Sequence, residues 1–205
     1  MAESTGFRAV LVIGAHREEL AFGDRVAEGL RDIPVEILRI PNGLSGRRPR
    51  QDETFRYGIE HRELYLQLRQ QLRGRADLFI DLHAGQDADG GRADLYCQDQ
   101  AFLECMRRRA PMRGRATRDG NDDAVRCLPL RSAEDAGTEA ACEAQGVLGT
   151  RTAVPRAVWG AHSPLYLALE IYLRSPGDQD AGGTALARDL VELALTCARR
   201  RSRKG

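Results

Sequence analysis

Two histidines and one glutamate have the side chains and positions of a metal site. His16 and Glu19 are three residues apart and follow a short apolar run directly, and His83 ends a second apolar run. Side chains at this spacing share one face where the chain is helical, so both can reach one ion. Two imidazoles and one carboxylate leave a position for water, as in catalytic zinc sites. We therefore expect one Zn²⁺ per chain, bound by His16, Glu19 and His83.

The same three residues also have a simpler explanation. His16 would then cap a helix, Glu19 would be solvated, and His83 would be a hydrogen-bonded residue at the end of a strand. A His-x-x-Glu pair alone is a weak signal, because such pairs occur by chance in a chain of this length. Their placement after strands favours the metal site, since the carboxyl ends of strands line the ligand crevice of open α/β sheets.

The elements that must position these residues follow one another in an alternating order. Apolar, β-branched runs predict strands at residues 8–14, 34–40, 77–83, 124–130 and 165–173. Helical spacing of apolar residues predicts helices at 18–31, 53–73, 98–109, 133–147 and 181–201. Residues 41–51, 86–92 and 113–123 are expected to be loops. This order predicts an α/β fold with a mainly parallel or mixed twisted sheet flanked by helices.

Composition fits one domain over residues 1–205, with a frayed basic tail at 199–205. The chain has 205 residues and a net charge of +1, which gives no general attraction to nucleic acid or to anionic membranes. No apolar run is long enough to span a membrane, and the first residues do not resemble a signal peptide. We therefore expect a cytoplasmic protein, with a homo-oligomer left open. The five cysteines form no Cys-x-x-Cys pair, so buried free thiols are expected rather than a disulfide framework.

The sequence resembles the succinylglutamate desuccinylase/aspartoacylase branch of the zinc carboxypeptidase superfamily. The matching features are Gly14–Glu19, then Asn42, then Asp81-Leu82-His83, and finally Glu170 within the apolar run Leu165–Leu173. The resemblance spans roughly residues 8–173 and implies a zinc-carboxypeptidase-like fold. It implies that the His-x-x-Glu pair and the later histidine bind zinc. It also implies that Glu170 is the general base that activates water and then protonates the leaving amine.

Further residues could assist this chemistry. Burial in an apolar strand would raise the pKa of Glu170, which suits a general base, although a structural carboxylate paired with an arginine is the alternative. Asp81 points to the same side of its strand as His83, so it either orients the imidazole or makes an unrelated structural hydrogen bond. By resemblance, Arg48, Arg56 and Asn42 would bind a substrate carboxylate. The alternatives are two solvated arginines and a turn asparagine.

Three functions follow as hypotheses. The first is a zinc-dependent deacylase that cleaves the amide bond of a small N-acyl amino acid. The second uses the same chemistry on N-formylglutamate or on a small peptide. The third, from another class, is a module that binds a small carboxylate without turnover. Metal content and the effect of changing Glu170 would separate the third from the first two.

Overall fold

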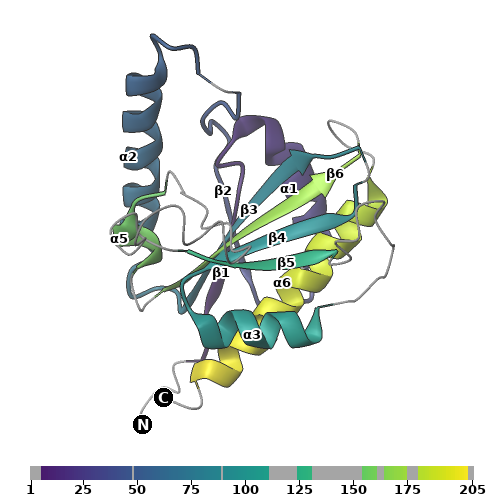
Figure 1. Ribbon diagram of the computed structural model, residues 1–205. Coiled ribbons are helices and arrows are strands. Elements are labelled where there is room, and N and C mark those ends of the chain that lie inside the picture. The colour runs from purple at the N-terminus through teal and green to yellow at the C-terminus, as the bar shows by residue number, and fades with distance from the viewer. Residues whose placement is uncertain are drawn as a thin grey trace, which may run out of the picture.

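The computed structural model describes residues 6–47, 49–88, 90–110, 124–130, 154–160, 164–174 and 180–202. These residues form a six-stranded sheet with helices on both of its faces (Figure 1). In chain order the elements are β1 (Ala9–Ile13), η1 (Arg17–Glu19), α1 (Leu20–Glu28), β2 (Glu36–Arg39), α2 (Thr54–Leu72), β3 (Leu78–Gln86), β4 (Arg92–Cys97), α3 (Gln100–Arg109), β5 (Val125–Pro129), α5 (Arg156–Trp159), β6 (Leu165–Leu173) and α6 (Ala181–Ser202).

The sheet is mixed, with the strand order β2-β1-β3-β6-β4-β5. The first four strands in this order are parallel to their neighbours, whereas β4 is antiparallel to β6 and parallel to β5. The predicted α/β class is confirmed. Because β1, β3 and β6 run in the same direction, their carboxyl ends meet at one edge of the sheet. The amino end of β4 reaches that same edge.

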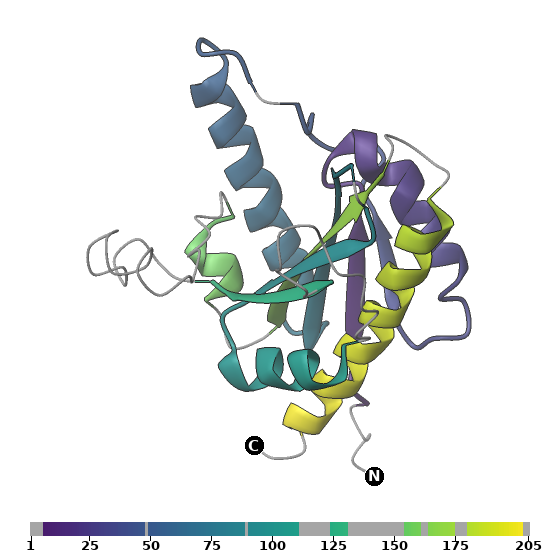
Figure 2. The ribbon, with the colours of Figure 1, turned by 45° about the vertical axis from the view of Figure 1, so that its right-hand side comes forward.

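Three helices cover one face of the sheet. Helices α1, α3 and α6 lie together on this face in both ribbon views (Figures 1 and 2). Alternate residues of the strands point toward them, because side chains in a strand alternate between the two faces. This larger part of the core contains buried residues such as Leu11, Ile80, Leu167, Phe22, Leu103 and Leu190.

Helices α2 and α5 cover the other face. Tyr65, Leu68 and Leu72 of α2 are buried there with Trp159 of α5. The first turns of α2 project beyond the sheet (Figure 2), and the Phe55 side chain is 81% exposed. The half of α2 that packs on the sheet is therefore its carboxyl-terminal half.

Several sequence predictions can be compared with the structure, and others fall outside the described residues. Residues 92–97, which received no strand, form β4, and their alternation of Ala93, Leu95 and Cys97 with polar residues is typical of a strand. Strand β3 continues to Gln86 because it stays paired with β6. Helix α6 includes residues 199–202 and ends at Ser202. The predictions for 113–123 and 133–147 lie outside the described residues.

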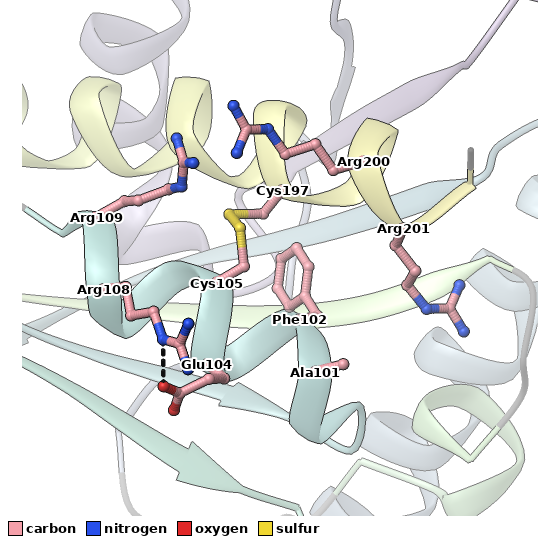
Figure 3. Close-up of a pocket in the computed structure, with 9 residues that line it drawn as sticks. All are labelled: Ala101, Phe102, Glu104, Cys105, Arg108, Arg109, Cys197, Arg200 and Arg201. Carbon is pink, nitrogen blue, oxygen red and sulfur yellow. Dashed lines mark hydrogen bonds and ion pairs between the residues drawn. A yellow bond between two sulfur atoms is a disulfide. The ribbon is translucent and has the colours of Figure 1, made fainter. Parts of the chain in front are cut away.

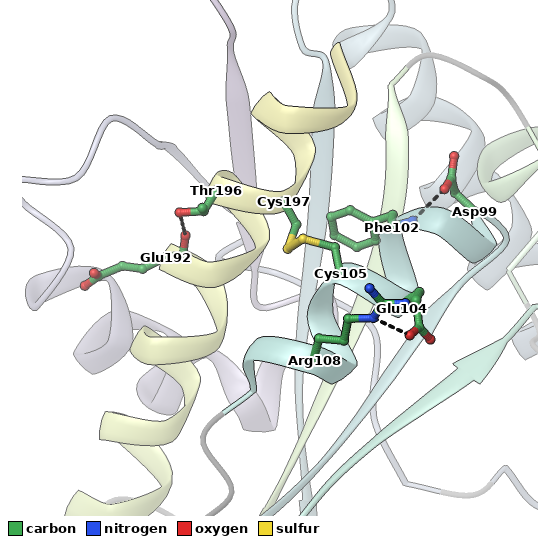
Figure 4. Close-up of a disulfide and its surroundings, with 8 residues drawn as sticks. All are labelled: Asp99, Phe102, Glu104, Cys105, Arg108, Glu192, Thr196 and Cys197. Atoms are coloured by element: carbon green, nitrogen blue, oxygen red, sulfur yellow. Dashed lines mark hydrogen bonds and ion pairs between the residues drawn. A yellow bond between two sulfur atoms is a disulfide. The ribbon is translucent and has the colours of Figure 1, made fainter. Parts of the chain in front are cut away.

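A disulfide joins Cys105 of α3 to Cys197 of α6, so the expectation of five free thiols was wrong (Figure 4). The two helices pack side by side on the sheet, and this brings together cysteines that are 92 residues apart in sequence. Spacing along the chain gave no sign of the pairing. Cys97 and Cys127 retain their thiols, and Cys142 lies outside the described residues.

The disulfide borders a hollow of about 660 Å³ between α3 and α6 (Figure 3). Phe102 and the two cysteines form part of its wall, and four arginines of the two helices surround it. Arg201 also pairs with Asp99, the residue that caps the start of α3. Among the described residues, no helix has the length and apolar character needed to cross a membrane.

Replacing Cys105 and Cys197 together by serine should lower the free energy of unfolding by roughly 2 to 4 kcal/mol, because the cross-link restricts the unfolded chain. Urea unfolding followed by circular dichroism measures this change. A reducing agent should destabilise the natural protein and leave the double variant unaffected. A natural protein whose urea midpoint does not respond to the reducing agent would contradict the assigned bond.

Candidate metal centre

A tight turn after β1 brings His16 and Glu19 together. Gly14 has a φ of +78°, and a Cβ atom there would lie 2.7 Å from the carbonyl oxygen of Ile40. The 3-10 turn η1 then follows His16, with the amide of Glu19 donating to the His16 carbonyl at 3.0 Å. The predicted helical arrangement of the His-x-x-Glu pair is therefore realised by a 3-10 turn that precedes α1.

The segment after β2 fixes this turn from the other side. The Leu44 amide donates to the Ala15 carbonyl and the Arg17 amide donates to the Leu44 carbonyl, both at 2.9 Å. Gly43 makes this approach possible, because a Cβ atom there would lie 1.9 Å from the carbonyl oxygen of Gly14. The backbone on both sides of His16, at Ala15 and Arg17, is thus fixed by hydrogen bonds to Leu44.

His83 reaches the same place from β3. Nδ1 of His16 lies 3.0 Å from one Glu19 carboxylate oxygen, and Nδ1 of His83 lies 3.0 Å from the other. One ligand atom from each of the three residues lies within 4.8 Å of the others. The structure therefore brings His83 together with His16 and Glu19, although His83 is 64 residues from Glu19 in the sequence.

A buried carboxylate supports His83 from behind. Asp81 is fully buried, and its Oδ2 lies 3.1 Å from Nε2 of His83. The hydroxyl groups of Tyr65 and Tyr166 donate to the same oxygen at 2.7 and 2.8 Å. Such a contact fixes the tautomer and the orientation of the ring, leaving Nδ1 of His83 directed at Glu19.

The charges of this group depend on one another. Burial alone would raise the pKa of Glu19, but hydrogen bonds from His16 and His83 outweigh it and hold the pKa below its usual value. Burial and the neighbouring Asp81 charge raise the pKa values of Tyr65 and Tyr166 well above the usual range, so both hydroxyls stay protonated as donors. The Nε2 atom of His16 is buried without a hydrogen-bond partner among the described residues.

Glu170 lies beside His83 on the neighbouring strand. The two residues are paired in register between β3 and β6, so their side chains are on the same face of the sheet. Burial is the main cause that raises the pKa of Glu170 to about 7. Gly85 leaves room for this carboxylate, because a Cβ atom at Gly85 would lie 2.8 Å from Oε1 of Glu170.

Of the residues predicted to bind substrate, Asn42 and Arg56 lie within the described part of the chain. Arg56 lies on the projecting part of α2, where its side chain is 84% exposed and pairs with Glu60 at 2.7 Å. Asn42 is exposed in the turn after β2, and Arg48 lies outside the described residues. Neither Asn42 nor Arg56 has a described contact with His16, Glu19 or His83.

Two hollows lie near the sheet edge at which the carboxyl ends of β1, β3 and β6 meet. One of about 400 Å³ reaches Glu19 and is also lined by Gly85 and Arg47. The other, of about 550 Å³, contains Arg47 again together with Arg56 and Tyr57. Arg47 therefore lines both hollows, the one that Glu19 lines and the one beside the first turns of α2.

Several residues around the centre were missed from sequence. His61 was not among the predicted site residues, but it is 7% exposed, with its ring 6.2 Å from that of His16 and 4.7 Å from that of Tyr65. Tyr166 was not predicted either, and its hydroxyl group donates to Asp81. The four-residue spacing of His61 and Tyr65 on a predicted helix could have placed both on the inner face of α2.

Comparisons with known proteins support the fold. No family model matches the sequence, and no curated protein matches it. Among solved structures, a mutant form of murine aminoacylase 3 gives a TM-score of 0.53 at 16% identity, covering 96% of this chain and 65% of that one. The unmodified murine aminoacylase 3 gives a TM-score of 0.51 at 16% identity, covering 96% and 66%. This chain thus shares their fold and spans about two thirds of their length.

Replacing Glu170 by glutamine should stabilise the metal-free protein increasingly as the pH rises from about 5 to 7. The native state holds a proton on Glu170 in this interval and the unfolded chain has lost it, so the Glu170 contribution to stability falls as the pH rises. The difference in the free energy of unfolding between the variant and the natural protein should reach roughly 2 to 3 kcal/mol near pH 8. Urea unfolding in the presence of a chelator measures it. The exposed Glu192 of α6, changed to glutamine, is the control, and a difference independent of pH would contradict the assignment.

Proposed function

We propose that this protein is a zinc-dependent hydrolase that cleaves the amide bond of a small N-acyl amino acid. The observation that carries the proposal is the placement of Glu170 beside His83, at the edge where His16, Glu19 and His83 meet. A general base next to a divalent-metal ligand set is the arrangement that water-dependent amide hydrolysis requires. The likeness in fold to a protein named an aminoacylase agrees with this proposal.

The three side chains suit a zinc ion in their chemistry. Two neutral imidazole nitrogens and one carboxylate form a standard catalytic zinc set. Both Nδ1 atoms point at the Glu19 carboxylate, and Asp81 accepts from the opposite nitrogen of His83, as in many zinc sites. When bound, zinc supplies polarisation of the amide carbonyl and a lower pKa for a water molecule.

The other residues of the site have roles that follow from their positions. Glu170 takes the proton of the attacking water at its carboxylate and then delivers it to the leaving amine nitrogen. A pKa near 7 suits both tasks, because the group can accept and release a proton at neutral pH. Asp81, with Tyr65 and Tyr166, keeps the His83 ring in place. Arg48, Arg56 and Asn42 remain predictions for binding a substrate carboxylate.

Zinc titration tests the metal centre without any substrate. The metal-free protein should bind one equivalent of Zn²⁺ in a calorimetric titration, and changing His83 to alanine or Glu19 to glutamine should abolish or greatly weaken binding. Changing Asp81 to asparagine should weaken it roughly 10- to 100-fold. Glu28 at the end of α1 is exposed, so its change to glutamine is the control. A protein that takes up no zinc would refute the centre.

Changing Glu170 to glutamine should lower kcat by roughly 10² to 10⁴-fold while zinc binding is retained, because the general base is lost and the ligands are not. The measurement is steady-state hydrolysis of a panel of N-acetyl, N-formyl and N-succinyl amino acids, with zinc content measured in parallel. Hydrolysis confined to N-formylglutamate or to small peptides would move the activity to the second hypothesis. Zinc and ligand binding without any hydrolysis would favour the binding module.

A further inference from the structure

A cluster of polar residues extends the candidate site along the sheet, beyond Glu170. Asp94 of β4 is paired in register with Glu170, and Arg126 of β5 is paired in register with Asp94. His83, Glu170, Asp94 and Arg126 therefore lie in a row on one face of the sheet. At a strand spacing of about 4.8 Å, the row is roughly 14 Å long between its end backbones. Neither Asp94 nor Arg126 was predicted from the sequence to belong to the site.

The carboxylate of Asp94 has no capacity left for a ligand. It is 1% exposed and accepts from Nε and Nη2 of Arg126, at 2.6 and 2.5 Å. The hydroxyl groups of Tyr96 and Tyr172 donate to it at 3.0 and 2.9 Å. Four hydrogen bonds are about as many as a carboxylate accepts. The two tyrosine protons are used in the same contacts.

Donors remain only on the guanidinium of Arg126. Asp94 occupies Nε and Nη2, and no other hydrogen bond of Arg126 occurs among the described residues, so Nη1 keeps its two N–H groups. The Arg126 side chain is 36% exposed, whereas Asp94 behind it is buried. A guanidinium fixed from behind by a carboxylate, with its outer edge open, is suited to bind an anion through directed hydrogen bonds.

We propose that Arg126 binds a side-chain acidic group on the amine half of the substrate and thereby determines specificity. The inference rests on the proposed function, because the role of Glu170 as general base determines how the substrate is oriented along the row. The acyl half lies on the side of His83, and the leaving nitrogen must lie next to Glu170. The amine half then extends along the row toward Asp94 and Arg126. Arg126, rather than the exposed Arg56, is the arginine that this part of the substrate meets.

A pair of substrates that differ in one charge tests the assignment. N-acetyl-L-glutamate and N-acetyl-L-glutamine have nearly the same shape, and only the first carries a second acidic group. The zinc-loaded natural protein should favour the glutamate compound in kcat/KM. Changing Arg126 to glutamine should lower kcat/KM for N-acetyl-L-glutamate roughly 10- to 100-fold, with a much smaller loss for N-acetyl-L-glutamine. The ratio of the two values is the readout.

Two further variants separate specificity from folding. Arg126→Gln leaves the buried Asp94 without its cation, so the double variant Asp94→Asn with Arg126→Gln removes both charges together. Arg126→Lys keeps a positive charge but not the forked geometry, and its ratio should lie between those of the natural protein and Arg126→Gln. Arg75→Gln, at the opposite end of the sheet, is the control and should leave the ratio unchanged.

The outcomes distinguish this inference from the proposed function. If every Arg126 variant slows both substrates equally, Arg126 is only structural and the inference is wrong. The same holds if Arg47→Gln or Arg56→Gln removes the preference instead. If the natural protein hydrolyses neither compound and no member of the N-acyl amino acid panel, the proposed function fails, and binding of N-acetyl-L-glutamate measured by calorimetry then tests the anion site alone. Binding weakened at least tenfold by Arg126→Gln would keep the anion site, and unchanged or undetectable binding would overturn it.

Discussion

The carboxylate of Asp81 is the contact on which the site depends. It is fully buried, and an isolated buried charge would be strongly unfavourable. Two tyrosine hydroxyls and one imidazole compensate it, and they come from α2, β6 and β3. The same oxygen therefore joins three elements of the fold and fixes the ring that faces Glu19. Removing any one partner would leave this buried charge less well compensated and would weaken the other contacts, so the three partners are coupled through it.

The direction of the strands determines where the chemistry collects. Parallel pairing of β1, β3 and β6 places the end of each strand at the same edge, where His16, His83 and Glu170 lie. Because β4 is antiparallel to β6, its first half, with Asp94, lies beside Glu170. The site thus combines the ends of parallel strands with the beginning of an antiparallel one.

Sequence alone predicted the residues that local pattern can identify. The His16 and Glu19 pair, the strand carrying His83 and the apolar strand around Glu170 were found because spacing and hydrophobicity place them. His61 and Arg126 were not, since their surroundings arise from long-range pairing of α2 with the sheet and of β5 with β4. The link between Cys105 and Cys197 was missed for the same reason: nothing in a linear sequence reports which faces of two helices will meet.

Some residues of the site lie inside the loop that the disulfide closes, and others lie before it in the sequence. Residues 105 and 197 close a covalent ring that contains Glu170 and Arg126, whereas His16, Glu19 and His83 precede it. A protease that cuts once inside the ring would not release a fragment, because the two pieces would stay joined until a reductant opened the bond. Glu170 and Arg126, which would transfer protons and bind the substrate's acidic group, therefore lie in a segment that is held covalently at both ends.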